Sequence, residues 1–145
     1  MANVDLKDFY GRYIAGLNSR DWDTVGKLIA EDVHVNGTAY KRENVIAGLK
    51  GIADAVPDFY WTVHDLFTDD NRIAARLQDT GTPIKPFLGH EPTGASLNIM
   101  EYGSYRVEDG LFIDMWFLID ATTAGAQLRT QAGTVGADVD RESVT

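Results

Sequence analysis

The chain has 145 residues, no cysteine, and a formal net charge of −9 from 22 acidic and 13 basic residues. The length fits one domain, and the charge excludes partners that present phosphate, because nucleic acids and anionic membrane surfaces are bound by basic faces. The absence of cysteine excludes disulfides, thiol catalysis and thiolate metal sites.

The start of the chain shows no basic patch followed by an apolar run, so we do not expect a signal peptide. No stretch approaches the length of a membrane span. The expected location is therefore cytoplasmic.

The first part of the chain has the apolar spacing of short amphipathic helices. A helix is predicted from Leu6 to Leu17, where apolar residues recur at positions i, i+3, i+4 and i+7. Asp21 can cap a short second helix over residues 22–29, and Val33 to Asn36 alternate like a brief strand. A third helix is predicted over residues 43–52.

From residue 59 the apolar period changes to two, which is typical of strands. The pattern predicts long strands over residues 59–67, 72–82, 95–107 and 111–120. Tight turns over residues 69–71 and 108–110 and a proline-rich loop over residues 83–94 connect them. Helices followed by consecutive antiparallel strands predict an α+β domain rather than a doubly wound parallel sheet.

The domain is predicted to span residues 1–123. Residues 124–145 are small and polar, with few aliphatic side chains, so we predict a polar and flexible C-terminal tail there. The sequence shows no internal repeat and no second domain.

Several short motifs follow one another in a set order between residues 5 and 120. They are Pro57-Asp58, Asp70-Asn71-Arg72-Ile73-Ala74-Ala75-Arg76, Thr80-Gly81-Thr82, Phe87-Leu88-Gly89, Pro92-Thr93-Gly94, Tyr105-Arg106-Val107-Glu108-Asp109-Gly110 and Trp116 to Asp120. In this order and spacing the chain resembles the SnoaL-like branch of the nuclear-transport-factor-two-like superfamily, which is named after polyketide cyclases. The resemblance implies a cone-shaped α+β barrel of the cystatin-like class, with N-terminal helices packed on a curved antiparallel sheet around a pocket, and homodimers formed through the outer sheet face.

The same resemblance places the family's catalytic positions on residues that cannot transfer a proton. The carboxylate of the cyclases falls on Phe117, two family histidines fall on Met115 and Pro83, and a polar position on the preceding strand falls on Gly103. One face of the last strand is therefore predicted to be apolar and to point into the cone, either as plain core or as the wall of a hydrophobic ligand site. That face holds Ile113, Met115, Phe117 and Ile119.

Glu101 is the preferred candidate for proton transfer. It has the strand parity of Gly103 and should face inward, where burial raises the pKa of a carboxyl group into the range of a general base. The alternative is that Glu101 pairs with Arg76 on the neighbouring strand, as a structural pair or as the polar floor of a pocket. Asp65 and Asp79 are the next candidates.

Tyr13 is the second predicted catalytic residue. The segment from Arg12 to Asn18 resembles the isomerase branch, in which a tyrosine here binds an oxyanion, so a phenol at residue 13 could donate a hydrogen bond to a substrate oxygen. The alternative is a helix tyrosine with its ring in the core and its hydroxyl at the rim. The predicted ligand-binding residues are Asn36, Trp61, Arg76, Met115 and Phe117, and the alternative role for Trp61 is sheet packing.

No metal or cofactor is expected. The three histidines, His34, His64 and His90, lie on separate elements without a metal-binding spacing, and no phosphate loop or dinucleotide fingerprint occurs.

Two functions remain open. The first is an enzyme that cyclises, isomerises or dehydrates a cyclic, largely apolar metabolite through Glu101 and Tyr13. The second is a non-catalytic protein of the same fold that binds such a molecule. In both cases the expected partners are a small apolar or aromatic metabolite and a second copy of the chain, held through Trp116 and Leu118 on the outer sheet face.

Overall fold

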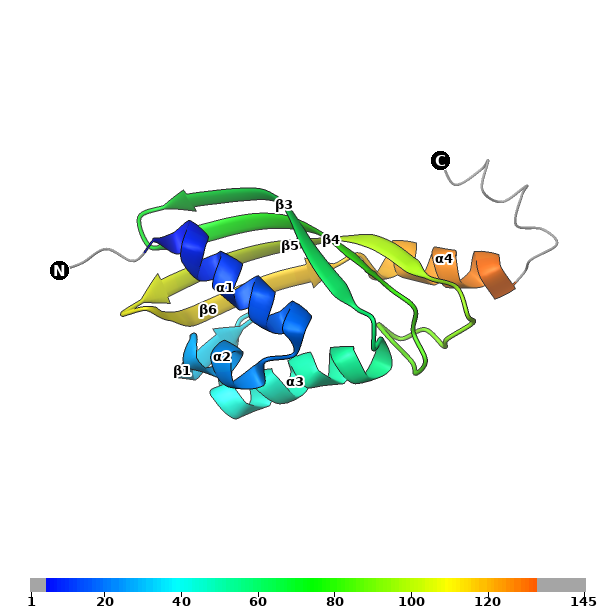
Figure 1. Ribbon diagram of the computed structural model, residues 1–145, viewed down its shortest axis with the longest axis horizontal. Coiled ribbons are helices and arrows are strands. Elements are labelled where there is room, and N and C mark those ends of the chain that lie inside the picture. The colour runs from blue at the N-terminus through cyan, green and yellow to red at the C-terminus, as the bar shows by residue number, and fades with distance from the viewer. Residues whose placement is uncertain (1–4, 133–145) are drawn as a thin grey trace.

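The computed structural model describes residues 5–132 and has helices packed on one curved sheet (Figure 1). The elements in chain order are α1 (Leu6–Ser19), α2 (Trp22–Lys27), β1 (Ile29–Val35), β2 (Thr38–Lys41), α3 (Arg42–Ala55), β3 (Tyr60–Asp69), β4 (Arg72–Gly81), β5 (Leu97–Glu108), β6 (Leu111–Ile119) and α4 (Ala121–Ala132). The predicted α+β class is confirmed.

The six strands form a single sheet in the order β2-β1-β6-β5-β4-β3. All neighbours are antiparallel except β1 and β6, which pair in parallel. The prediction of an antiparallel sheet is therefore correct for the four long strands and wrong for this pair. Sequence reasoning also missed β2, because all four of its residues are exposed and show no apolar alternation.

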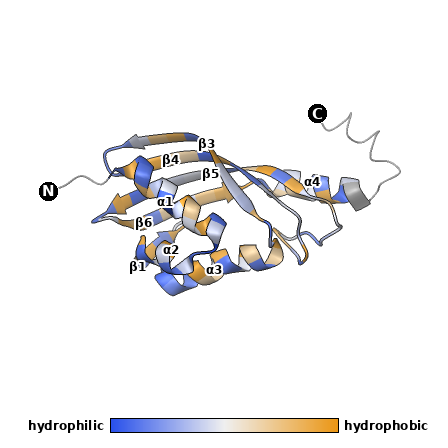
Figure 2. Ribbon diagram, in the orientation of Figure 1, coloured by the Kyte–Doolittle hydropathy of each residue, from blue (hydrophilic) through white to orange (hydrophobic). Residues whose placement is uncertain are grey.

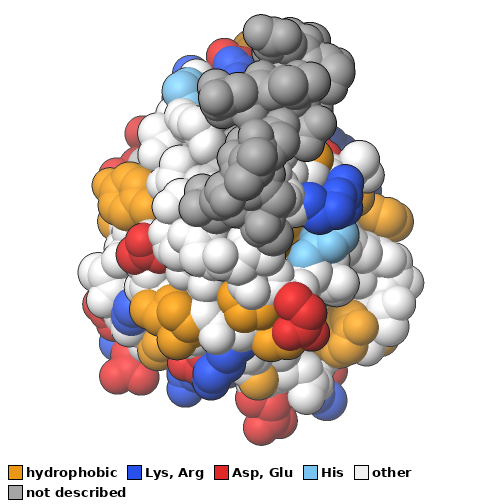
Figure 3. All heavy atoms as spheres, turned by 90° about the vertical axis from the view of Figure 1, so that its right-hand side faces the viewer, with side chains coloured by type: hydrophobic (Ala, Val, Ile, Leu, Met, Phe, Trp, Pro, Cys, Tyr) orange, Lys and Arg blue, Asp and Glu red, His pale blue; other side chains and the backbone are white. Residues whose placement is uncertain are grey.

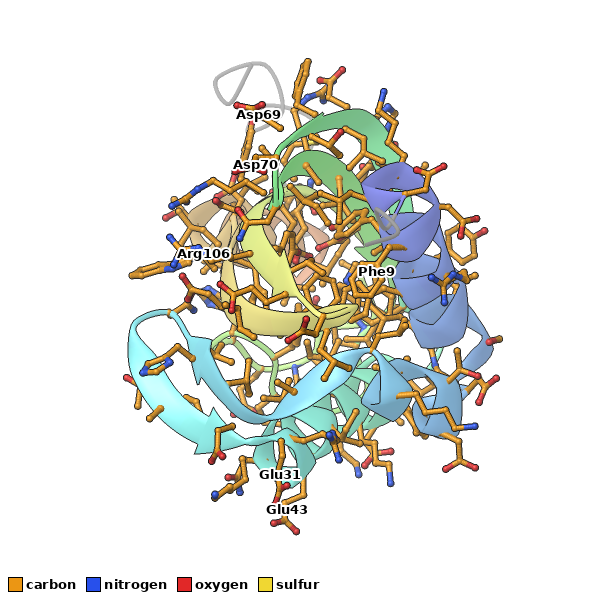
Figure 4. All side chains as sticks on the ribbon, turned by 90° about the vertical axis from the view of Figure 1, so that its left-hand side faces the viewer. Phe9, Glu31, Glu43, Asp69, Asp70 and Arg106 are labelled. Carbon is orange, nitrogen blue, oxygen red and sulfur yellow. The ribbon has the colours of Figure 1, made fainter. Side chains whose placement is uncertain are left out.

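The first helix covers the sheet. Asp5 caps α1 by accepting hydrogen bonds from two backbone N–H groups, and Arg20 ends it in the left-handed conformation. One face of α1 is buried against the strands, and Phe9 projects from it toward the interior with 1% of its surface exposed (Figure 4). This helix brings tyrosine side chains over the middle of the sheet.

Strict alternation along β4 and β5 determines which side chains face the helices. Burial alternates from one residue to the next along both strands, and Figure 2 shows that each carries hydrophobic and hydrophilic residues. The odd-numbered residues from 73 to 81 and from 97 to 107 are buried. Glu101 and Asp79 have this parity and face the interior, whereas Arg76 has the opposite parity.

Register shifts change the alternation on β6 and on β3. The register of β6 against β5 shifts between Arg106 and Val107, so Phe112 is fully buried and Ile113 is not. The prediction that Ile113 shares an inward face with Met115 is therefore wrong. A second shift, between Val63 and Asp65 on β3, turns Asp65 to the outer face.

The chain after β6 forms a further helix, α4, which lies at the right-hand end of the molecule in Figure 1. Ala124 and Leu128 are buried on it, and the Thr93 hydroxyl donates a hydrogen bond to the Leu128 carbonyl. The prediction of a flexible tail is wrong for residues 124–132, because two small or aliphatic side chains a turn apart suffice to dock a short helix. The rest of the predicted tail, residues 133–145, lies outside the described residues.

Figure 3 views this end of the molecule, where apolar side chains are interspersed with charged and polar ones. None of the helices within residues 5–132 is long and apolar enough to cross a membrane.

Candidate functional site

A small cavity lies between α1, α3 and the concave face of the sheet. Its volume is about 10 Å³, room for about one water molecule. Its lining residues are Tyr10, Tyr13, Ile14, Leu17, Leu49, Ile52, Trp61, Glu101, Tyr105, Phe117 and Ile119. Glu101 is the only ionisable acid in this lining, so its carboxyl group is the chemically distinctive feature of the cavity.

An open apolar groove of about 350 Å³ lies next to the cavity, between α3 and strands β1, β2 and β6. The groove is lined by Val35, Tyr40, Asn44, Val45, Gly48, Leu49, Ile52 and Phe117. Leu49, Ile52 and Phe117 line both hollows and form the partition between them. The groove has the size of a small-molecule site, and Phe117 stands between it and Glu101.

Glu101 lies beside a second acid, Asp79. They occupy diagonal positions on β5 and β4, since Leu77 is opposite Glu101 and Asp79 is opposite Ile99. Asp79 is fully buried and Glu101 is 5% exposed. Taken as carboxylates, both oxygens of Asp79 and the Oε1 atom of Glu101 have no hydrogen-bond donor within residues 5–132.

Both acids bind protons more strongly than ordinary carboxyl groups. Burial is the largest cause and raises the pKa of each. The hydrogen bond between them raises the pKa of Asp79 further and lowers that of Glu101, and a hydrogen bond from Trp61 lowers the pKa of Glu101 as well. The prediction of an inward-facing Glu101 with a raised pKa is consistent with this geometry.

Three tyrosines pack around the cavity. The ring of Tyr13 lies 4.8 Å from that of Phe112, and the Tyr10 and Tyr105 rings lie 5.2 Å apart. The hydroxyl oxygens of Tyr10 and Tyr105 are 3.2 Å apart and share a hydrogen bond, in which Tyr13 takes no part. Burial raises the pKa of all three phenols, so each is a hydrogen-bond donor rather than a phenolate near neutral pH.

The glycine at residue 103 makes room for one of these tyrosines. A Cβ atom built at Gly103 would collide with the Tyr105 hydroxyl. That hydroxyl therefore fills the space that a side chain at residue 103 would occupy. A polar group is thus present there, although residue 103 itself has no side chain. Sequence reasoning missed Tyr105 and Tyr10, although the shared parity of Tyr105 with Glu101 on an alternating strand was a usable signal.

The Asn18 side chain holds Trp61 in the cavity wall through two hydrogen bonds. Asn18 at the end of α1 donates a hydrogen bond to the Trp61 carbonyl and accepts one from the Trp61 N–H, both at 2.9 Å. The Trp61 ring packs on Phe59 with centroids 4.5 Å apart. Trp61 thus lines the cavity and packs the sheet at once, while its role in ligand binding stays a prediction.

The structure does not bring Asn36 and Arg76 into the cavity. Asn36 lies in the turn between β1 and β2, and its side-chain oxygen accepts a hydrogen bond from the Phe117 N–H at 3.0 Å. Arg76 points to the outer face and forms an ion pair with Asp65 at 2.7 Å. The alternative in which Arg76 pairs with Glu101 is wrong, because Arg76 on β4 and Glu101 on β5 have their side chains on opposite faces of the sheet.

The two predicted apolar residues of β6 differ in position. Met115 is fully buried in the core and is absent from the walls of both hollows. Phe117 is half-buried and lines both. Of the pair, Phe117 is the one in a position to touch a ligand.

Within the described part of the chain, no group of three or more histidine or acidic side chains is placed to hold a metal ion. The Nε2 atom of His64 lies 2.8 Å from the Gln78 side chain and that of His90 lies 3.0 Å from the Ala121 carbonyl. A third hollow, near Glu31 and Glu43 at the lower edge of Figure 4, is lined mainly by charged side chains at the surface. It does not include Glu101.

A curved six-stranded sheet that carries helices on its concave face, with a tyrosine-lined cavity between them, defines a nuclear-transport-factor-two-like domain. The family model that matches the chain, over residues 7–128, is that of the SnoaL-like polyketide cyclases. The chain therefore belongs to the SnoaL-like polyketide cyclase family, as the order of its motifs predicts.

Solved structures share this fold. A SnoaL-like polyketide cyclase from Agrobacterium tumefaciens is 25% identical, with a TM-score of 0.81 over 87% of this chain and 99% of the other. IdmH from Streptomyces antibioticus is also 25% identical, with a TM-score of 0.75 over 90% and 99%. TsrD from Streptomyces laurentii, at 22% identity, has a TM-score of 0.79 over 88% and 97%, which shows the fold alone. No match was found among the curated proteins.

Proposed function

We propose that this protein binds a cyclic, largely apolar small molecule in the groove beside Phe117 and catalyses proton-transfer chemistry on it, such as cyclisation, isomerisation or dehydration. The observation that carries the proposal is a buried carboxyl group, Glu101, in the wall of a cavity that adjoins an open apolar groove. A binding site of this kind combines an apolar body with one or two reactive polar groups.

Glu101 acts as the general base and then as the acid. It removes a proton from a carbon next to a carbonyl group and returns it to the product, which requires a pKa closer to neutrality than that of an exposed glutamate. Burial raises the pKa of Glu101 in that direction. The negative charge that develops on the carbonyl oxygen is stabilised by the Tyr13 phenol, which lines the same cavity and donates a hydrogen bond.

Access to Glu101 depends on Phe117. The inner cavity of about 10 Å³ cannot hold more than about one water molecule, whereas the outer groove of about 350 Å³ can hold a ring system. The body of the ligand therefore occupies the groove, and its reacting end reaches Glu101 when the Phe117 ring turns aside. Phe117 is half-buried and borders the open groove, which supports this movement.

Native mass spectrometry of the purified protein identifies a bound metabolite, which then serves as the substrate or as the lead to it. With that substrate, Glu101→Gln and Tyr13→Phe should each lower turnover at least about tenfold, since each removes one proton-transfer or hydrogen-bonding group. Asp65→Asn and Tyr60→Phe are matched controls on the outer face, and they should leave turnover unchanged. Unchanged turnover in both cavity variants would overturn the catalytic assignment.

A non-catalytic binding protein is the second candidate. It is supported by Phe117, Met115 and Gly103, which stand where the family resemblance places catalytic side chains. In this case the wild-type protein binds the co-purified metabolite without converting it, and Glu101→Gln changes neither the affinity nor the bound species. Conversion of the metabolite by the wild-type protein excludes this candidate.

We also propose that the protein forms a homodimer through its outer sheet face. Tyr102, Trp116 and Leu118 are exposed there, at 56%, 48% and 74% of their surfaces, around a hollow of about 390 Å³. A cluster of large exposed apolar side chains of this kind is typical of a protein contact.

A further inference from the structure

Asp79 and Glu101 form a buried pair of acids, of which the proposed reaction uses only Glu101. Only Glu101 lines the cavity, while Asp79 lies behind it with no exposed surface. A fully buried acid in a small domain is costly unless it has a partner or a function.

Within residues 5–132, no cation neutralises the pair. The titratable groups that face it are phenols: Tyr10 and Tyr13 from α1 and Tyr105 from β5. The other elements around the cavity present neutral side chains, which are Trp61 from β3, Leu49 and Ile52 from α3, and Phe117 and Ile119 from β6. Two adjacent carboxylates in such surroundings cannot both be charged, so the pair keeps at least one proton near neutral pH.

Burial and hydrogen bonding decide which acid keeps that proton. As a carboxylate, Asp79 would leave two buried oxygens without a donor, whereas Glu101 would leave only Oε1. Glu101 also has slight exposure and faces the cavity, where a water molecule fits. The charge is therefore better tolerated on Glu101.

We propose that Asp79 is a positioning residue that stays protonated and donates its hydrogen bond to Glu101, so that Glu101 is the first of the two acids to ionise. The carboxyl hydrogen of Asp79 holds one oxygen of Glu101 and leaves the other directed to the cavity. The inference deepens the proposed function, in which Glu101 is the base, but it concerns the free protein and its test needs no substrate. The shared hydrogen bond raises the pKa of Asp79 and lowers that of Glu101, which agrees with this assignment.

The test is a carbon-13 NMR titration of the side-chain carboxyl groups in the full-length protein. Glu101→Gln and Asp79→Asn assign the two signals. In the wild-type protein the Glu101 signal should move with a midpoint above its ordinary value of 4.5, while the Asp79 signal keeps the chemical shift of a protonated acid beyond that midpoint. The opposite order, or two independent titrations near ordinary acid values, would overturn the proposal.

Two substitutions of Asp79 test the assignment through the direction in which they shift the titration midpoint of Glu101. Asp79→Asn keeps a donor, so the Glu101 midpoint should stay within about half a pH unit of the wild-type value. Asp79→Leu removes the donor but no charge, so the midpoint should rise by about one unit or more. If Asp79 were the ionised member, both variants would instead remove a repulsion and lower the midpoint.

Asp65→Asn is the matched control, because Asp65 lies on the outer face in an ion pair with Arg76, and it should not move the Glu101 midpoint. If Asp79→Leu does not fold, the wild-type titration still decides the order of ionisation. The expected titration combined with full turnover by Glu101→Gln would support the proton assignment and refute the proposed function, so the two can fail separately.

Discussion

At the scale of single residues, the site is built from groups that do not favour folding. Asp79 and Glu101 occupy inward positions of two alternating strands where apolar side chains would pack without a desolvation cost. Positions of this kind, where a local rule is broken without a stabilising gain, concentrate at functional sites. This supports a role for the pair beyond the core.

The pair should make stability depend on pH. In the folded protein the pKa of Asp79 is raised from 3.8 to about 10, mainly by burial. Between these values the folded state binds a proton that the unfolded state has lost. The free energy of unfolding therefore falls as pH rises above about 4, by up to about 1.4 kcal/mol per pH unit from this group.

Asp79→Asn removes this proton and should flatten the fall. Urea unfolding at pH 5, 6, 7 and 8 measures the two slopes, and the variant should become more stable relative to the wild-type protein as pH rises. Asp65→Asn is the control and should leave the slope of the wild-type protein unchanged. Parallel curves for Asp79→Asn and the wild-type protein would show that Asp79 ionises normally.

The sequence predicts that the Glu101 side chain faces inward, but it does not predict which residue lies beside it. Alternation on β5 is enough to place Glu101 inside, and that prediction is confirmed by its burial. The alternative partner, Arg76, has the opposite charge, yet its parity on β4 is that of the outer face. Strand parity was the better guide, since Asp79 is the acid of β4 that shares the parity of Leu77.

At the scale of elements, a single side chain joins α1 to β3. Asn18 makes two hydrogen bonds with the backbone of Trp61, as a neighbouring strand would. Asn18→Ala leaves both groups of a buried residue unpaired and should lower the free energy of unfolding by about 2–3 kcal/mol. Denaturant unfolding measures this free energy. The control is Ser19→Ala, one residue away on the exposed side, which should change the free energy of unfolding by less than about 0.5 kcal/mol.

An Asn18→Ala protein as stable as the Ser19→Ala control would mean that water replaces the two hydrogen bonds of Asn18.

The hydrogen bonds between Asn18 and Trp61 could not be predicted from the sequence. They depend on the end of a helix meeting the start of a strand 43 positions further along the chain, and no local pattern encodes that meeting.

The last helix gives a second prediction at this scale. Leu128 is 1% exposed and fixes α4 to the end of the sheet. Leu128→Ala should lower the free energy of unfolding by about 2–4 kcal/mol, whereas Arg129→Ala on the exposed side should have little effect. Equal stability of the two variants, measured by thermal or urea unfolding, would show that α4 is not part of the cooperative unit.

At the scale of the whole molecule, the fold was predictable because it depends on patterns that tolerate substitution. Structures only 22–25% identical share it with TM-scores of 0.75 to 0.81. The positions of the tight turns and long alternating strands carry that information. The parallel pairing of β1 with β6 was not predictable, since it joins segments about 80 residues apart through a strand with few buried side chains.

The outer sheet face gives the prediction that belongs to the whole molecule. Trp116 and Leu118 on β6 and Tyr102 on β5 point away from the helices, and the Trp116 ring also packs against Gly37 at the β1–β2 turn. In a homodimer this face is covered by its equivalent on the second copy, so a charge at its centre is buried without a partner. Trp116→Glu should therefore shift the protein from dimer to monomer in sedimentation velocity or on a sizing column. Ile84→Glu, at a residue 61% exposed in the loop between β4 and β5, is the matched control and should leave the dimer intact. A dimer that survives Trp116→Glu and dissociates with Ile84→Glu would place the contact at the loop end of the sheet instead.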